Sequence, residues 1–354
     1  MLTALARIVV VLVGAATLAV LAWPQFFGLQ NAGVVAHAVS LRGLAVVVAA
    51  VLLVVLAVVL VLARPMRGTT ALLMVLLLAF GAVNIGILLH RGVGSDAAAS
   101  SETTAAPADA AASITVLSWN TLGDAPAAEA IAALAVAEDA DVLTLPETTE
   151  ETGVRIAEAL RAAGRPMWVH TVSFDLISKA RSTTLLISPD LGDYTVTSAA
   201  GSGPPGNTNV LPTVVAVPVD GAGPTIIAVH AVAPIRWEMA NWRSDLDYLA
   251  GQCSTERTGS GGVIMAGDFN ATLDHFAGRA TEPGAVLGDC RDAAATTGSG
   301  GLGTWPAAAP SLLGSPIDHV LATADWHIER MRVIDTQDDA GSDHRPIAAT
   351  LTTG

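Results

Sequence analysis

Long apolar runs near the N-terminus constrain this chain more than any other feature. Residues 44–63 and 71–89 contain no charged residue, and each is close to the length of about 20 apolar residues that a helix needs to cross a bilayer core. A shorter run spans about residues 4–23. A signal peptide is the alternative for that run, but two further runs follow at once and no small-residue cleavage site leads into a soluble domain. The sequence therefore predicts a membrane domain, residues 1–91, with three transmembrane helices at about 4–23, 44–63 and 71–89.

The short loops between these runs predict an orientation. Arg7 precedes the first run, and Arg64 and Arg67 lie between the second and third. The positive-inside rule places all three in the cytoplasm, so the N-terminus is expected there and everything after Arg91 outside the cytoplasm. Arg42 and Arg91 lie on the opposite side in this arrangement, so three arginines support the orientation and two oppose it.

A linker separates the apolar runs from a C-terminal domain. Residues 92–112 are rich in Ala, Ser, Thr and Pro without apolar periodicity, which predicts a flexible linker before a domain at 113–354. The two cysteines, Cys253 and Cys290, both lie in that domain. In an oxidising compartment they would pair and stabilise the fold by roughly 3–4 kcal/mol. Two unrelated buried thiols are the alternative.

The C-terminal domain is strongly acidic. All 32 acidic residues lie after Arg91, together with 13 of the 18 basic ones, so this part of the chain carries a formal charge of −19. Nonspecific nucleic-acid binding requires Lys and Arg side chains that neutralise phosphates, but the chain has a single lysine, Lys179, and no basic cluster. Because such a surface repels a long polyanion, nucleic acid is the less expected partner.

Apolar strands and amphipathic helices alternate in the C-terminal domain. Apolar residues with helical spacing predict helices at 125–139, 151–164 and 236–252, and short apolar runs predict strands. The predicted strands are 114–120, 141–148, 182–190, a hairpin within 212–234, 261–270, 315–323 and 346–353. This mixture predicts a single domain built as a two-layer β-sandwich with helices packed outside.

Polar residues with metal-binding or catalytic side chains follow the apolar strands. They are Asn120, Glu147, His230, Asp268 with Asn270, Asp318 with His319, and Asp343 with His344. Asp and Asn are ordinary turn residues, so each position alone is also explained by loop solubility. As a set they offer oxygen and imidazole ligands without cysteine, which suits Mg²⁺, Mn²⁺ or Ca²⁺ rather than a structural zinc ion.

Six short motifs around these residues resemble one known superfamily. In chain order they are SWN at 118–120, LPE at 145–147, HAVAP at 230–234, GDFN at 267–270, IDHV at 317–320 and SDHRP at 342–346. The series is similar to that of the endonuclease/exonuclease/phosphatase superfamily, which includes deoxyribonucleases, neutral sphingomyelinases and inositol-polyphosphate 5-phosphatases. The resemblance implies an α/β (α+β) four-layer sandwich of two packed mixed sheets flanked by helices, here preceded by the three transmembrane helices. The composition is typical of a bacterium with a GC-rich genome.

The resemblance also implies a metal site. Glu147 is expected to bind a divalent cation, Mg²⁺ first with Mn²⁺ or Ca²⁺ as alternatives. Asn120 would lie beside Glu147, and Asp343 would complete the coordination. Pro146 stands where the family usually has Gln, which puts the local geometry in doubt but not the ligand.

The remaining motif residues are implied to carry the catalytic roles. Asp268 would accept a proton from the attacking water, and Asn270 would donate a hydrogen bond to a phosphate oxygen or place that water. We expect these two side chains to share one strand face, because strand side chains alternate with period two. His344 would contact the phosphate with Asp318 fixing its ring, and His230 would be a second imidazole facing the phosphate.

Other polar and aromatic residues have weaker signals. His319 is expected to pack or to line the pocket, and Asp274 with His275 is expected to lie in a solvated loop, with the rim of the site as the alternative. Trp237 and Trp242 are expected to pack in the core, and contact with a lipid headgroup is the alternative for both.

The resemblance implies a phosphoester hydrolase whose substrate the motifs leave open. We expect a membrane-anchored, extracytoplasmic, metal-dependent phosphodiesterase or phosphatase that acts on a small or lipid-linked phosphoester. An extracellular nuclease is the alternative, and it would need a basic stripe for which Arg236, Arg243 and Arg345 are the nearby candidates. A catalytically silent binding domain is a third possibility, against which the presence of every motif argues.

Overall fold

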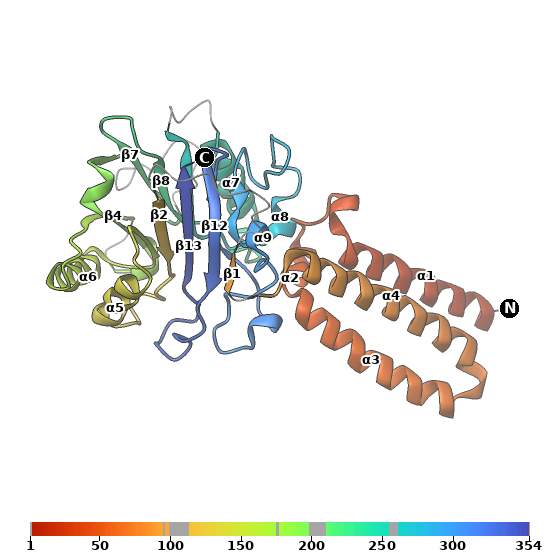
Figure 1. Cartoon of the computed structure of the whole chain (residues 1–354). Coiled ribbons are helices and arrows are strands. Elements are labelled where there is room, and N and C mark those ends of the chain that lie inside the picture. The colour runs from red at the N-terminus through yellow and green to blue at the C-terminus, as the bar shows by residue number, and fades with distance from the viewer. Residues whose placement is uncertain are drawn as a thin grey trace.

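The computed structural model describes residues 2–94, 96–98, 113–174, 177–197, 210–254 and 261–353. Three helices are long and apolar enough to cross a membrane, which agrees with the predicted membrane anchoring. They are α1 (Leu2–Ala22), α3 (Arg42–Leu62) and α4 (Arg67–Arg91). They form an elongated bundle that projects from one side of the β-rich domain (Figure 1).

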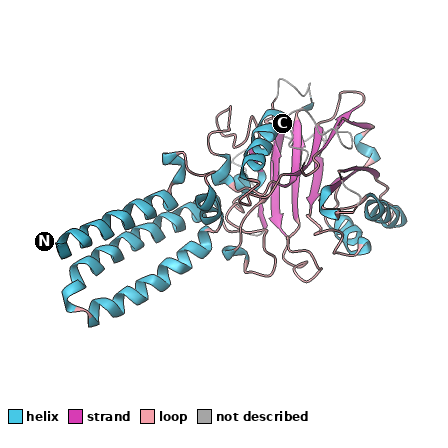
Figure 2. Cartoon of the chain, turned by 180° about the vertical axis from the view of Figure 1, so that it is seen from behind, coloured by secondary structure: helices cyan, strands magenta, loops and turns pink. Residues whose placement is uncertain are grey.

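The helical bundle has a small core and a largely apolar exterior. Ala22, Ala49, Leu77 and Phe80 are buried between its helices, while most of the Val and Leu side chains of α3 point outward. A helix that is apolar all round is stable only when lipid or other protein covers it. The turn η1 (Pro24–Phe27) and the short helix α2 (Gly33–Ser40) connect α1 to α3 at the end nearest the β-rich domain (Figure 2).

Two mixed sheets build the C-terminal domain, as the sequence predicts. In spatial order the first contains β1 (Asp96–Ala98), β12 (Trp326–Val333), β13 (Ile347–Thr353), β2 (Ser113–Ser118), β3 (Val142–Pro146), β5 (Ser182–Ile187) and β4 (Trp168–Ser173). The second contains β10 (Arg291–Asp292), β11 (Asp318–Ala322), β9 (Val263–Asp268), β8 (Thr225–His230), β7 (Val214–Pro218) and β6 (Tyr194–Val196).

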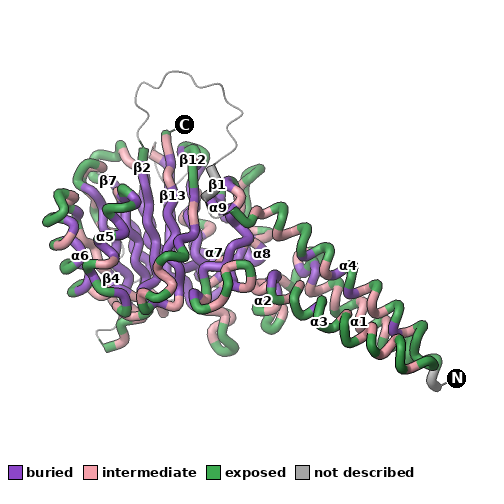
Figure 3. Tube along the Cα trace, turned by 60° about the horizontal axis from the view of Figure 1, so that its bottom comes forward, coloured by how far each residue is buried: buried purple, intermediate pink, exposed green. Residues whose placement is uncertain are grey.

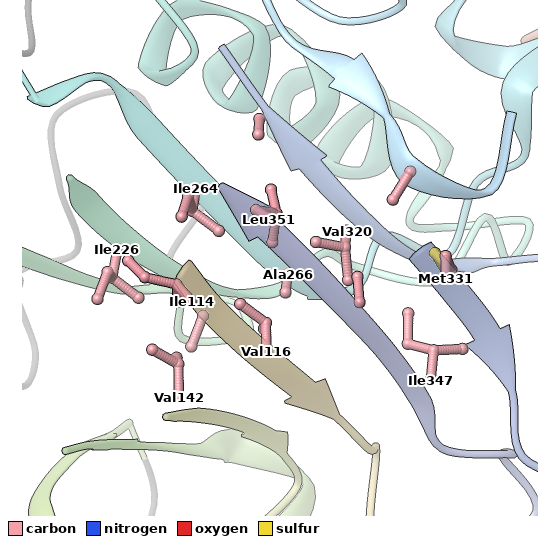
Figure 4. Close-up of a cluster of buried hydrophobic side chains, with 14 of the residues drawn as sticks. Ile114, Val116, Val142, Ile226, Ile264, Ala266, Val320, Met331, Ile347 and Leu351 are labelled. Atoms are coloured by element: carbon pink, nitrogen blue, oxygen red, sulfur yellow. The ribbon is translucent and has the colours of Figure 1, made fainter. Parts of the chain in front are cut away.

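Apolar side chains fill the space between the two sheets. Ile114 and Val116 of β2 meet Ile226 of β8 and Ile264 of β9 in this core (Figure 4). The intervening residues of the same strands pack with the covering helices, so the strands are buried along their length (Figure 3). This explains why they read as continuous apolar runs rather than as alternating ones.

Helices cover the outer faces of both sheets and complete the predicted four layers. Helices α5 (Ala128–Ala137) and α6 (Glu150–Ala162) pack on the first sheet. Helix α7 (Met239–Gln252) packs on the second, where the short helix α8 (Leu273–Phe276) also lies. Helix α9 (Ala293–Thr297) follows β10 and contributes Ala293 and Ala294 to the core between the sheets.

A disulfide joins Cys253, directly after α7, to Cys290 in the segment before β10, and their Cα atoms are 5.8 Å apart. The sequence left this pairing open. Both residues are fully buried, so the bond ties the end of α7 to the neighbouring loop inside the protein.

The segment expected to be a flexible linker begins with ordered contacts. Gly94 donates a backbone hydrogen bond to Gly298, and residues 96–98 form β1, which pairs with β12 at the edge of the first sheet. Residue 95 and residues 99–112 of the predicted linker lie outside the described residues.

The expectation that Asp274 and His275 lie in a solvated loop is wrong. Both are 1% exposed. Asp274 accepts hydrogen bonds at 2.8 and 2.7 Å from the guanidinium group of Arg42 and at 2.9 Å from Arg91. Arg42 donates a further bond at 2.7 Å to Asn84 of α4. Because a charge can be buried only when it is paired, this cluster holds the membrane bundle against the β-rich domain.

Candidate active site

The predicted site residues lie on one edge of the sandwich, where strands end or begin. In the second sheet, parallel pairing of β8 and β9 sets His230 beside Asp268, and antiparallel pairing of β9 and β11 sets Asp318 on the other side of Asp268. Three residues far apart in the chain therefore form one row across the sheet. In the first sheet, β2 and β3 run parallel, so Asn120 and Glu147 follow them at the same edge.

Asn120 connects the two sheets at this edge. Its amide nitrogen lies 3.2 Å from Oε1 of Glu147 and 3.1 Å from Oδ2 of Asp268. Its amide oxygen accepts a bond at 3.0 Å from the backbone of Leu122. Asn120 thus presents its NH₂ group, not its oxygen, to both carboxylates, and it holds Glu147 and Asp268 close together.

His344 and Asp318 form a buried pair. Nδ1 of His344 donates to Oδ2 of Asp318 at 2.9 Å, and Nε2 lies 3.8 Å from Oδ2 of Asp268. Burial by itself lowers the pKa of the His344 ring, but the carboxylates of Asp318 and Asp268 outweigh that effect and raise the pKa. The ring is therefore held in one orientation and favours its protonated form.

A tight turn at the end of β9 holds the Asp268 carboxylate. The backbone N–H of Asn270 donates to Oδ1 of Asp268 at 2.8 Å, and its side-chain amide donates to Oδ2 at 3.2 Å and to the carbonyl of Ala231 at 2.9 Å. Asn270 lies beyond the strand with a left-handed φ of 47°. The two side chains meet because the chain turns back, so the explanation by strand periodicity is wrong. Burial raises the pKa of Asp268, which makes its carboxylate a stronger base.

His230 is a buried, neutral imidazole at the same edge. Burial, with a contribution from the nearby His344, lowers its pKa to about 3. Nε2 lies 3.8 Å from Oε1 of Glu147, and Nδ1 has no hydrogen-bond partner among the described residues. Among the described residues no carboxylate is hydrogen-bonded to the Nδ1 atom of this ring.

Glu147 and Asp343 offer carboxylate oxygens of the kind that bind a hard cation, and they lie close enough to interact electrostatically. Glu147 has a left-handed φ of 58° directly after Pro146, which turns its carboxylate toward Asn120 and His230. Burial raises the pKa of Glu147, and the carboxylate of Asp343 adds to this shift. Oδ1 of Asp343 has no hydrogen-bond partner within the described part of the chain. Unpaired carboxylate oxygens that repel each other fit a divalent cation.

Asp268, Asp318 and His344 also bring three potential ligand atoms within 4.8 Å of one another. The Asp318 hydrogen bond already occupies Nδ1 of His344. Glu147 and Asp343 offer further carboxylate oxygens near this group.

Three residues that hydrogen-bond the site residues have no role predicted from the sequence. Trp305 donates from Nε1 to Oδ2 of Asp343 at 2.9 Å, Ser342 donates to the carbonyl of Asn120 at 2.6 Å, and Thr121 donates to the carbonyl of Glu147 at 3.0 Å. Ser342 is the first residue of the SDHRP motif and Thr121 directly follows the SWN motif, and these positions are the signals that mark them. Trp305 lies in a loop far from every motif.

Several candidates from the sequence lie outside the site. His319 is buried against Phe269 and Phe276 and bonds Asp292 at 2.7 Å, so it packs as expected. Trp242 is also fully buried, as expected, but Trp237 is 78% exposed and the expectation of core packing is wrong for it.

Known proteins resemble this chain in sequence motifs and in fold. The model of the family described as "Endonuclease/Exonuclease/phosphatase family" matches residues 117–344. The endonuclease/exonuclease/phosphatase from Bacteroides vulgatus is 14% identical, covers 69% of this chain and 100% of its own, and has a TM-score of 0.50. The endonuclease/exonuclease/phosphatase from Beutenbergia cavernae is 20% identical, covers 68% of this chain and 72% of its own, and has a TM-score of 0.49. The mannosyl-6-phosphatase of Bacteroides thetaiotaomicron is 16% identical over 68% and 99%, with a TM-score of 0.47. No curated protein matches significantly.

Proposed function

The chain belongs to the endonuclease/exonuclease/phosphatase family, and from that premise we propose that it is a membrane-anchored, metal-dependent phosphoester hydrolase. The observation that carries the proposal is the link between the two carboxylates: Asn120 holds Glu147 and Asp268 together, with His344 facing Asp268 from the other side. This gives one place at which a base, a cationic hydrogen-bond donor and a cation site all reach the same phosphoryl group.

Two of these side chains have separate roles in the proposed hydrolysis. Asp268, held by Asn270, takes a proton from water and directs that water at phosphorus. His344, oriented by Asp318, donates to a phosphoryl oxygen and stabilises its growing charge. The bond from water oxygen to phosphorus forms, the ester P–O bond breaks, and the products are an alcohol and a phosphate.

Glu147 and Asp343 would hold the divalent cation, Mg²⁺ in the first instance. When bound, it would neutralise charge on the phosphoryl oxygens and on the leaving group. Asn120 keeps the Glu147 carboxylate in place through its amide nitrogen. His230 stays neutral and offers a ring nitrogen to the phosphate without adding charge beside the cation.

The site is proposed to face the outside of the cytoplasm. Arg42 and Arg91, which oppose this orientation in the sequence, both pair with Asp274, so they serve the contact between the bundle and the β-rich domain. Arg7, Arg64 and Arg67 remain at the far end of the bundle as the charges that the positive-inside rule counts. The disulfide also supports an oxidising compartment.

A small or lipid-linked phosphoester is the proposed substrate, in preference to nucleic acid. Arg345 is 3% exposed and bound to Asp338, and Arg243 bonds the carbonyl of Asn31. Of the three candidates for a basic stripe, only Arg236 is exposed. With a formal charge of −19 on this part of the chain, no described surface is suited to a long polyanion.

The experiment compares Asp268→Asn with the unchanged full-length protein in Mg²⁺, on a chromogenic phosphodiester, a chromogenic monoester and plasmid DNA. We expect ester hydrolysis that EDTA abolishes and that Asp268→Asn lowers by roughly 100- to 10,000-fold. Asp190→Asn is the matched control, because Asp190 is exposed and outside the site. DNA cleavage without ester hydrolysis would establish the nuclease alternative, and full activity of Asp268→Asn would exclude the proposed base.

A further inference from the structure

A pocket of about 310 Å³ opens directly beside the catalytic residues. Asn270 and His344 are among its lining residues, so a ligand in this pocket would lie next to a phosphate at the site. The volume is at the lower end of the range of roughly 300–1,000 Å³ that is usual for small-molecule sites.

One wall of this pocket comes from the membrane domain. Ala36, His37 and Ser40 of α2 line it, although they lie more than two hundred residues before the catalytic motifs in the chain. His275 holds α2 in place, because its Nε2 lies 3.1 Å from the carbonyl of Ala36. The Arg42 and Asp274 pair fixes the first residue of α3, two positions after α2 ends.

The opposite wall is made by residues that adjoin catalytic positions. Ala233 to Ile235 follow the strand that ends at His230, and Ile317 directly precedes Asp318. Trp305, which bonds Asp343, forms another part of the lining. A ligand in the pocket would therefore contact the segments that position the catalytic groups.

The lining suits an apolar ligand. Within the described part of the chain it includes no Asp, Glu, Lys or Arg side chain. Its histidines are His37, His275 and His344, and His275 is already bonded to Thr272 and Ala36. Ile235, which lines the pocket, is 42% exposed, so the apolar lining reaches the outside at this residue.

We propose that this pocket is the subsite for the apolar chain of a lipid-type phosphoester, with α2 of the membrane domain as its specificity-determining wall. The inference rests on the proposed hydrolase and narrows its substrate to esters whose alkyl or prenyl chain begins next to the phosphate. Helix α2 lies in the chain between α1 and α3, two helices long enough to cross a bilayer, and this supports the occupant because such helices would bring the pocket to the lipid. The pocket takes the first part of the chain, and the remainder stays in the bilayer.

The test uses full-length protein in lipid nanodiscs with Mg²⁺ and two inert probes, butylphosphonate and octylphosphonate, corrected for binding to empty nanodiscs. Each methylene that enters the pocket should tighten binding roughly threefold, so octylphosphonate should bind at least about tenfold more tightly. Ser40→Leu, which fills the pocket from α2, should reduce this ratio to below about threefold. Val34→Leu is the control, because Val34 lies on the same helix but is 84% exposed and outside the lining. Ala233→Leu repeats the test from the opposite wall.

Hydrolysis of butyl and octyl phosphate by the same variants separates the two proposals. Phosphonate binding that depends on alkyl-chain length, without hydrolysis, would contradict the proposed hydrolase function and support the proposed subsite. Hydrolysis with equal kcat/KM for both esters would contradict the proposed subsite and leave the proposed hydrolase function standing. A binding ratio that Ser40→Leu leaves unchanged would do the same.

Discussion

Single side chains at the active site are held by partners distant in sequence, and His344 depends most on one of them. Asp318 accepts the hydrogen bond from Nδ1 of His344 and is itself 3% exposed. The arrangement leaves Nε2 as the ring atom that faces Asp268 and the substrate. The orientation of the imidazole, rather than its presence alone, is what this pair provides.

We therefore expect Asp318→Asn to lower kcat by roughly 100-fold, because His344 loses both its orientation and the charge that keeps it protonated. Steady-state kinetics on a chromogenic ester measures this. The Asp190→Asn protein should keep the original kcat, and a variant at Asp318 with unchanged kcat would show that His344 needs no partner.

His275 makes the stability of the protein depend on pH. Burial lowers its pKa to about 4, below the ordinary value near 6.5, and neutral Nδ1 accepts a bond at 2.8 Å from the N–H of Thr272. Its contribution to stability is complete above pH of about 6.5 and is lost as the pH falls toward 4, by up to about 1.4 kcal/mol per pH unit. Thermal unfolding in detergent between pH 7 and pH 5 should show the loss. His275→Gln, which keeps a side-chain acceptor for the helix start, should unfold with a smaller pH dependence, and equal slopes would contradict the assignment.

The sequence predicts the residues of the site well but not their support. Each catalytic residue lies in a short motif at a strand end, which is a local signal. The turn that brings Asn270 back to Asp268, and the bond from Trp305 to Asp343, depend on contacts that no local pattern encodes.

At the scale of elements, the connection between α8 and the membrane helices is the feature that the sequence conceals. Asp274 of α8 pairs with Arg42, which lies 232 positions away in the chain. The local sequence around Asp274 is typical of a solvated loop and does not indicate a buried ion pair. Helices α5, α6 and α7 are predicted from their periodicity, but β4 and β12, which are six and eight residues long, are absent from the predicted strands. The three-residue strands β1 and β6 and the two-residue β10 are too short for any period to be visible.

Asp274→Asn should destabilise the protein by about 3–5 kcal/mol, because the buried guanidinium group of Arg42 loses its counter-charge. Asp247→Asn is a matched control, since it removes an ion pair to Arg279 in which Asp247 is 67% exposed, and it should cost less than about 1 kcal/mol. Thermal unfolding of the full-length proteins in detergent makes the comparison. Equal costs for the two variants would mean that Asp274 does not hold the domains together.

At the scale of the whole molecule, the bundle and the sandwich form one unit with the catalytic edge beside α2. This arrangement holds the site beside the helical bundle, although the sequence predicts a flexible linker. The sandwich could be expected from motif order, but its fixed position on the bundle could not, because the contacts involve single polar residues rather than an extended apolar face.

The proposed orientation makes a direct prediction for cells. Protease added to spheroplasts should digest the C-terminal domain, while a tag at the N-terminus should stay protected until lysis. Protection of the C-terminal domain in intact spheroplasts would place the active site in the cytoplasm.

The central claim is that strand ends from Asn120 to His344 surround one divalent cation. Anomalous diffraction from crystals of the full-length protein soaked with Mn²⁺ tests it most directly. We predict a single strong peak within coordination distance of the carboxylates of Glu147 and Asp343, which Glu147→Gln abolishes. A peak between Asp268, Asp318 and His344, or no peak on this edge of the sandwich, would contradict the account.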